Sequence, residues 1–116
     1  MSDLEELLGR MYSAFNARDI EAVLALLHPD VDWPNGWEGG RIIGRDGVRD
    51  YWTRQWAAID PTVTPVRYRA EPDGRLGVDV RQMVRDSDGK LLFDGVVRHV
   101  YRFRNGLVLD MQIESA

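Results

Sequence analysis

Two stretches near the start of the chain decide the fold: MYSAFNARD at residues 11–19 and LLHPDVDWP at residues 26–34. Apolar side chains recur over residues 4–15 at the spacing of one helix face, and the first stretch closes that pattern. In the second stretch, Pro29 disfavours helical backbone at the residue before it. The chain is therefore expected to open with two short amphipathic helices and then to become extended.

Three helices are expected in the first half of the chain. Ser2 with Glu5 three residues later is the pattern of a helix N-cap, and Asp19 caps a second helix that should end at His28. A third helix is expected over about residues 46–59. It should bury one apolar face made of Val48, Tyr51, Trp52, Trp56 and Ile59.

The second half is expected to be an antiparallel meander. Turn signals at residues 72–74, 88–89 and 105–106 divide it into four strands. These strands should span residues 62–71, 75–86, 91–104 and 107–114. Two shorter extended pieces, near residues 31–33 and 41–43, are expected between the second and third helices, joined by a glycine-rich loop.

The lengths of these turns predict which side chains share a face of the sheet. A two-residue turn at 105–106 sets Tyr101 opposite Asp110 and His99 opposite Gln112. One face should then collect Val66, Tyr68, Val78, Val80, Gln82, Phe93, Val97, His99, Tyr101, Phe103, Asp110, Gln112 and Glu114. A slip of one residue would exchange the two faces, so this prediction depends on the turns.

The opposite face is expected to be partly apolar. The turn at 88–89 sets Val84 opposite Phe93. The second face should then carry Arg81, Arg85, Arg98, Arg102, Met83, Val96, Val100, Leu109, Met111 and Ile113. An apolar patch of that size is costly to leave in water, and a two-fold interface would bury it. The sequence therefore predicts a homodimer through this outer sheet face.

Composition limits the class of protein. A chain of 116 residues can bury one core, so one domain over residues 1–116 is expected. The net charge of −4 and the absence of a basic stripe argue against a nucleic-acid partner. No apolar run approaches the roughly 20 residues of a membrane span, and no signal-peptide pattern is present. A cytoplasmic protein without a membrane partner is expected.

The order of these elements and the segment Tyr12 to Asp19 resemble the SnoaL-like and ketosteroid-isomerase-like proteins of the NTF2-like superfamily. The resemblance implies an α+β, cone-shaped NTF2-like (cystatin-like) fold. In that fold three N-terminal helices pack on a curved antiparallel sheet and enclose a pocket. It leaves the chemistry open, because one fold can carry both enzymes and binding proteins.

The resemblance also implies roles for two residues. Tyr12 matches the tyrosine that donates a hydrogen bond to the developing oxyanion of the isomerases. His99 falls where those enzymes place a protonated aspartic acid as the second donor, and a histidine can also donate there.

The isomerase base, an aspartate immediately before a proline, is not matched. Here Trp33 precedes Pro34, and Asp32 should point to the opposite side of the strand. Three possibilities stay open: Asp32 reaches in through irregular backbone, a base comes from Asp110 or Glu114, or the chemistry differs.

His99 and Asp110 are diagonal neighbours in the expected register. A carboxylate that orients an imidazole is a recurrent general-base arrangement, so this pair is a candidate acid–base site. The alternative is that these polar groups only satisfy one another at the open end of the sheet.

Aromatic residues predict the wall of the pocket. Trp33 and Trp37 flank the glycine-rich segment 35–40 and should line or cover a cavity for a flat apolar ligand, whereas Trp52 and Trp56 are expected mainly in the core. The full set of candidate ligand contacts is Phe15, Trp33, Trp37, Trp52, Trp56, Tyr68, Gln82, Tyr101, Gln112 and Glu114. With two histidines and no cysteine, neither a metal site nor a cofactor is expected.

The expected function is therefore that of a small hydrophobic-ligand pocket protein. Its chemistry, by resemblance, is that of a cofactor-free isomerase or cyclase that moves a proton on a carbonyl or polyketide-like molecule. Two alternatives remain from other classes: a non-catalytic small-molecule binding module, and a protein-interaction module that uses the outer sheet face.

Overall fold

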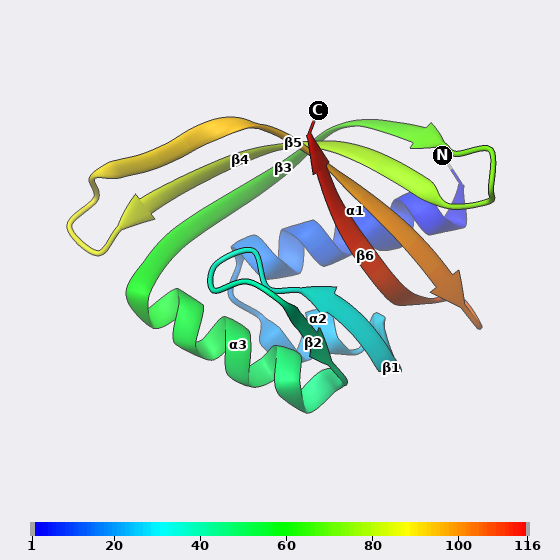
Figure 1. Ribbon diagram of the computed structural model, residues 1–116, viewed down its shortest axis with the longest axis horizontal. Coiled ribbons are helices and arrows are strands. Elements are labelled where there is room, and N and C mark those ends of the chain that lie inside the picture. Colours follow the sequence, from blue (N-terminus) through cyan, green and yellow to red (C-terminus); the bar gives the residue numbers. More distant parts are fainter. Residues whose placement is uncertain (1, 116) are drawn as a thin grey trace.

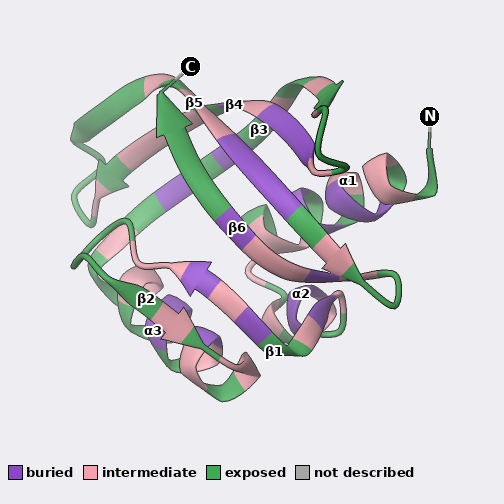
Figure 2. Cartoon of the chain, turned by 45° about the vertical axis from the view of Figure 1, so that its right-hand side comes forward, coloured by how far each residue is buried: buried purple, intermediate pink, exposed green. Residues whose placement is uncertain are grey.

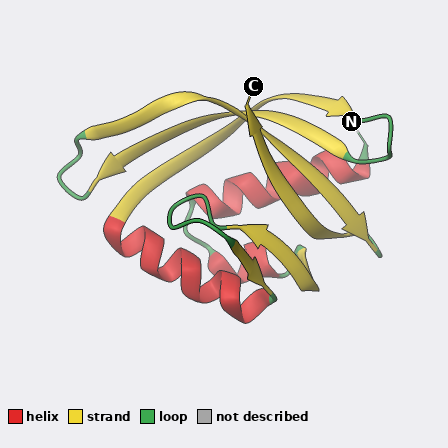
Figure 3. Ribbon diagram, in the orientation of Figure 1, coloured by secondary structure: helices red, strands yellow, loops and turns green. Residues whose placement is uncertain are grey.

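Three helices pack against one side of a strongly curved, open six-stranded sheet (Figures 1 and 3). The computed structural model describes residues 2–115. Its helices are α1 (Asp3–Asn16), α2 (Ile20–Leu24) and α3 (Arg45–Ala58). Its strands are β1 (Leu27–Pro34), β2 (Arg41–Ile43), β3 (Ile59–Ala70), β4 (Leu76–Asp86), β5 (Leu91–Arg104) and β6 (Leu107–Ser115). No helix within this range is long and apolar enough to cross a membrane.

The sheet has the order β2-β1-β6-β5-β4-β3. The strands β3 to β6 form the expected antiparallel meander, and β1 extends it by pairing parallel to β6. The long strands arch over α1 and α3, and the short β1–β2 hairpin lies beside α3 (Figure 1). The expected α+β cone fold is confirmed.

The helix starts follow the sequence signals. The Ser2 side chain accepts a hydrogen bond from the Glu5 amide at 3.2 Å, and the Asp19 carboxylate accepts one from the Ala22 amide at 3.3 Å. At the other end of α1, the Asn16 side chain makes two hydrogen bonds to the backbone of Val63, at 2.7 and 2.9 Å. These bonds fasten the helix to β3.

The expected end of the second helix was wrong. α2 stops at Leu24, and Leu27 already begins β1, which runs through Pro29. The Leu26 carbonyl accepts its hydrogen bond from the Val108 amide of β6, at 3.0 Å. Pairing with a distant strand therefore overrides the local helical pattern.

The expected register of the last hairpin was also wrong. Val84 does face Phe93 between β4 and β5, as expected. Between β5 and β6, however, a bulge near Leu109 shifts the register, so Tyr101 pairs with Met111 and not with Asp110. One extra residue turns every later side chain of β6 to the other face. The corrected pairs beyond the bulge are His99 with Ile113, Val100 with Gln112, Arg98 with Glu114, and Val97 with Ser115.

A second bulge corrects the expected position of Val66. The β3–β4 register shifts between Pro65 and Arg67, and Val66 is 63% exposed, although it was expected on the inner face. The break follows Pro65, which has no amide hydrogen to donate to the ladder. Tyr68 returns to the expected pairing with Val78.

The core lies between the helices and the inner face of the sheet (Figure 2). Its most deeply buried side chains are mostly branched aliphatics, which come from all three helices and from three strands: Leu8, Val23, Leu27, Val31, Val48, Val78, Val80 and Val108. Of the face expected for α3, Val48, Tyr51 and Trp52 are buried, whereas Trp56 and Ile59 are only partly so.

Candidate functional site

A cavity of about 570 Å³ opens between α1, α3 and the inner face of the sheet. Most of its wall is apolar or aromatic. The groups in the wall that can form hydrogen bonds through their side chains are three tyrosines, two glutamines, one histidine and the indoles. Among the described residues that line it, none is an aspartate, glutamate, lysine or arginine. The cavity therefore offers hydrogen bonds but no formal charge.

Three buried polar side chains form a cluster in this wall, which we call the Tyr–His–Tyr trio: Tyr12, His99 and Tyr101. His99 and Tyr101 alternate with Val100 on β5 and therefore point to the same face. The Tyr12 hydroxyl of α1 lies 2.9 Å from His99 Nδ1 and 2.6 Å from the Tyr101 hydroxyl. The three residues are 4%, 6% and 0% exposed.

Burial keeps the trio neutral. It lowers the pKa of His99 to about 4, from an ordinary value of 6.5, because no nearby carboxylate compensates for the loss of water. Burial also raises the pKa of Tyr12 and of Tyr101 well above the usual value for a phenol. At neutral pH the trio thus consists of one uncharged imidazole and two uncharged phenols, with the Tyr12 hydroxyl bonded to both of the others.

The hydrogen bonds of the trio allow two proton arrangements. In the first, His99 carries its proton on Nε2, Tyr12 donates to Nδ1 and Tyr101 donates to Tyr12. In the second, His99 carries its proton on Nδ1 and donates to Tyr12, which donates to Tyr101. The second arrangement leaves Nε2 as an acceptor and the Tyr101 hydroxyl as a donor for a ligand.

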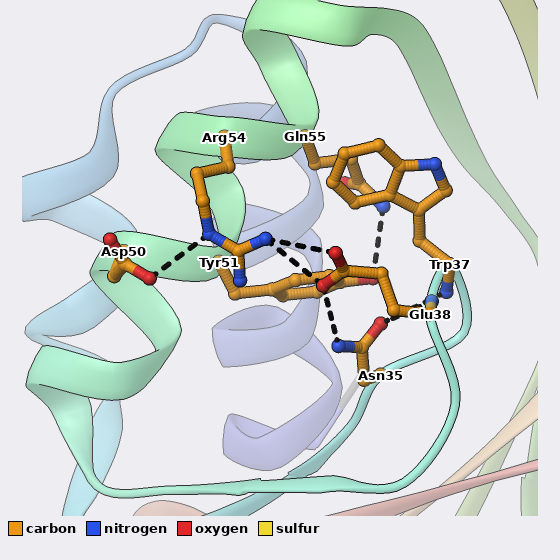
Figure 4. A network of polar contacts seen from close by, with 7 residues as sticks. All are labelled: Asn35, Trp37, Glu38, Asp50, Tyr51, Arg54 and Gln55. Atoms are coloured by element: carbon orange, nitrogen blue, oxygen red, sulfur yellow. Dashed lines mark hydrogen bonds and ion pairs between the residues drawn. The ribbon is translucent and has the colours of Figure 1, made fainter.

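A hydrogen-bonded loop forms part of the cavity wall. Residues 35–40 connect β1 to β2, and Gly36 and Trp37 of this loop line the cavity. The Asn35 side chain accepts hydrogen bonds from the amides of Trp37 and Glu38, at 3.2 and 2.7 Å. Glu38 is bound by Arg54 of α3 through contacts of 3.0 and 3.1 Å (Figure 4). The loop is therefore fastened to α3, and its Trp37 lies partly exposed in the cavity wall.

Comparison with known proteins identifies the family. The SnoaL-like domain matches residues 8–111. The chain belongs to the SnoaL-like family. Among curated proteins, none matches it.

Solved structures share this fold. An NTF2-like protein of unknown function from Burkholderia pseudomallei is 26% identical, covers 100% of this chain and 92% of its own, and has a TM-score of 0.85. TerC, co-crystallized with polyporic acid, is 24% identical over 99% of this chain and 92% of its own, with a TM-score of 0.84. A protein from Mycobacterium tuberculosis in complex with estradiol-17β-hemisuccinate is 20% identical over 97% and 93%, with a TM-score of 0.83.

This SnoaL-like chain brings eight of the expected site residues into the cavity wall. They are Tyr12, Phe15, Trp33, Trp37, Trp52, Gln82, His99 and Tyr101. The aromatic members pack edge to face: the ring of Trp52 lies 5.4 Å from that of Phe15 and 5.3 Å from that of Trp33, measured between ring centres.

The remaining expected site residues lie outside the cavity wall. Asp110, Gln112 and Glu114 point to the outer face because of the bulge in β6, so the structure does not bring Asp110 to His99. Asp32 also points outward, where Arg41 contacts it at 2.7 Å.

Two aromatic residues of the expected set pack elsewhere. Trp56 stacks on Trp52 and lies under the guanidinium group of Arg18, and Tyr68 lies near Gly9 of α1.

Sequence reasoning missed several residues of the wall. Met111 and Ile113 were expected on the outer face, and Tyr51 and Gln55 were not named as ligand contacts. Gln55 could have been found, since it lies four residues after Tyr51 and three after Trp52 on the inward stripe of α3.

Proposed function

We propose that this SnoaL-like chain binds a flat, apolar, carbonyl-bearing small molecule in its cavity and moves a proton on it without a cofactor. The observation that carries this proposal is the neutral trio of Tyr12, His99 and Tyr101, buried in the wall of an aromatic cavity. An aromatic wall favours a ligand with a flat hydrocarbon skeleton, and the trio favours a ligand with an oxygen at one end of that skeleton.

The size and the relatives support a small-molecule ligand. A volume of about 570 Å³ lies within the range of ligand pockets in proteins, about 300–1,000 Å³. Two similar proteins were solved with small molecules, TerC with polyporic acid and the Mycobacterium tuberculosis protein with estradiol-17β-hemisuccinate.

The proposed chemistry uses the second proton arrangement of the trio. His99 Nε2 accepts a proton from the carbon next to the ligand carbonyl. The C–H electrons form a carbon–carbon double bond while the carbonyl π electrons move onto oxygen, where the Tyr101 hydroxyl donates a hydrogen bond. The imidazolium that forms is stabilised by the adjacent enolate, and it returns the proton to the same carbon or to another one.

One observation favours a second candidate function, that of a non-catalytic binding module. In the first proton arrangement, His99 Nε2 carries the proton and Nδ1 accepts the hydrogen bond of Tyr12. Neither ring nitrogen is then free to accept a proton from a ligand. In the cavity as described, the pKa of His99 is lowered by burial to about 4, which makes it a weak base. A ligand would then be held through its oxygen without losing a proton.

Hydrogen–deuterium exchange of 2-tetralone in D₂O separates the two functions. The wild-type protein should speed exchange at the carbons next to the carbonyl above the protein-free rate. His99→Gln should lose roughly 100-fold of this rate while still binding 2-tetralone, since general acid–base catalysis contributes about that much. Asp110→Asn, on the outer face, is the matched control and should keep full activity. Saturable binding with no exchange in the wild type would favour the binding module.

We also propose that two copies associate through the outer face of the last strands. Val96 on this face is 49% exposed, which supports the proposal, although Met111 and Ile113 now belong to the cavity and Val100 is buried. Val96→Glu should convert a dimer to a monomer in analytical ultracentrifugation. A wild-type protein that sediments as a monomer at micromolar concentration would refute it.

A further inference from the structure

Two amides, Gln55 and Gln82, lie apart from the trio in the cavity wall. Gln82 is on β4, where it pairs with Gly95, whereas His99 pairs with Val78. Gly95 and His99 are four positions apart on β5, so Gln82, which lies opposite Gly95, points to the same face as His99, and the two positions are separated by about 13 Å at 3.3 Å per residue. The amides lie in the more open part of the wall, because both glutamines are only partly buried and Trp37, beside Gln55 in Figure 4, is 39% exposed.

The two amides have hydrogen-bonding capacity that the protein leaves unused. Gln55 donates from Nε2 to the Tyr51 hydroxyl at 3.0 Å, which orients its side chain and leaves the carbonyl oxygen Oε1 available (Figure 4). For Gln82, no side-chain hydrogen bond to another of residues 2–115 is present. A primary amide carries both donors and an acceptor, so together the pair can bind a hydroxyl or a carbonyl.

Apart from the trio, the two amides and Tyr51, most of the cavity wall is apolar or aromatic. It includes Trp33, Trp52 and Met111, which offer dispersion contacts and no strong hydrogen-bond acceptor. A ligand of hydrocarbon alone would cover the amides without satisfying them, and burying an unpaired amide costs free energy. The cavity wall therefore carries two separate polar groups, the trio and the amides, in a largely apolar lining.

We propose that Gln55 and Gln82 bind a second oxygen of the ligand, opposite the oxygen held by the trio. This inference rests on the proposed function, because it assumes that the ligand occupies the cavity. Because the side chains of Gln82 and His99 leave the sheet on the same face, we take the spacing of about 13 Å along the strands as the distance between their polar ends. Subtracting one hydrogen bond of about 3 Å at each end then leaves about 7 Å between the two ligand oxygens. That is the length of two fused six-membered rings. The ligand class is then a neutral, flat, fused-ring molecule with an oxygen at each end.

The neutrality of this ligand follows from the wall. With no charged side chain among the described lining residues, an anionic group would lose its water and gain no counter-charge. Specificity against carboxylates therefore comes from the lack of a cation in the wall, and specificity for the second oxygen comes from the amides.

Calorimetric titration with three naphthalene probes tests the inference. The wild type should bind 2,6-dihydroxynaphthalene about tenfold tighter than 2-naphthol, the gain that one or two net hydrogen bonds provide. It should bind 6-hydroxy-2-naphthoate more weakly than the diol. The double variant Gln55→Leu/Gln82→Leu should keep its affinity for 2-naphthol and lose the preference for the diol. Gln112→Leu, the same change on the outer face, should behave as wild type.

Several outcomes would overturn the inference. Equal affinities of the wild type for the diol and for 2-naphthol would do so, as would a double variant that loses both affinities equally while keeping its thermal unfolding midpoint. Tight binding of the naphthoate would overturn the neutral ligand class. If no naphthalene probe binds, this inference fails. The proposed function is still tested separately, by the hydrogen–deuterium exchange of 2-tetralone.

Discussion

The stability of the folded protein should fall in acid because of His99. Its pKa is lowered by burial from 6.5 to about 4 in the folded chain, and unfolding restores it to the ordinary value. Between these two values the unfolded chain binds more protons than the folded chain, so the free energy of unfolding rises with pH in this window. The contribution of His99 to the free energy of unfolding is therefore complete above pH 6.5, its pKa in the unfolded chain. It is lost as the pH falls toward about 4, the pKa of His99 in the folded chain.

The size of the effect follows from the shift. A difference of about 2.5 pKa units at 1.36 kcal/mol each gives about 3 kcal/mol between pH 7 and pH 4. That is a large share of the 5–15 kcal/mol typical of a small domain. Carboxylates also titrate in this range, so the effect has to be isolated by a variant that removes only the imidazole.

Urea denaturation of the wild type and of His99→Gln at pH 7 and at pH 4 isolates it. Between pH 7 and pH 4, the free energy of unfolding of the variant should fall by about 3 kcal/mol less than that of the wild type, because glutamine does not titrate. His28→Gln removes the second histidine of the chain, outside the cavity wall, and serves as the comparison. Parallel pH dependences of the wild type and His99→Gln would refute the idea that burial keeps this imidazole neutral.

Three further predictions concern the frame of the cavity. Asn16→Ala removes both hydrogen bonds to the Val63 backbone and should lower the free energy of unfolding by about 1–3 kcal/mol, as measured in urea. Trp37→Ala should weaken binding of the neutral dye Nile red far more than it lowers the melting temperature, and an equal loss of both would make this residue a packing residue only. Glu38→Gln weakens the contact with Arg54 and should speed amide hydrogen exchange in residues 35–40, whereas unchanged exchange would mean that this contact does not fasten the loop.

Local signals were enough to predict most of the elements. The Ser2 and Asp19 caps and the turns at 88–89 and 105–106 depend on hydrogen bonds and backbone preferences within a few residues. The same holds for the start of α3, which lies within one residue of the expected position 46. Such features can be read from sequence because no distant partner is needed to form them.

The bulges were not predictable in this way. Leu109 and Val66 are displaced because the paired strands shift register, and the energy of that shift depends on contacts across the whole sheet. One undetected bulge moved Asp110 out of the cavity and brought Met111 and Ile113 into it. The early end of α2 has the same origin, since it depends on β6.

The site was predicted in part. Tyr12 and His99 were named as partners of one ligand oxygen, and the structure brings them within 2.9 Å of each other. The direct hydrogen bonds of Tyr12 to His99 and to Tyr101 were not foreseen, because they join α1 to β5 and depend on how these two distant elements pack. Gln55 was passed over because a glutamine on an amphipathic helix usually faces water.

Infrared difference spectroscopy of bound 2-tetralone, labelled with ¹³C at its carbonyl, tests most directly whether the trio holds the ligand oxygen. Hydrogen bonding from Tyr101 should lower the carbonyl stretching frequency of the bound ketone well below its value in hexane, and Tyr101→Phe should move it back toward that value. A bound ketone that absorbs as it does in hexane, in both the wild type and the variant, would show that its oxygen does not meet the trio and would contradict the proposed site.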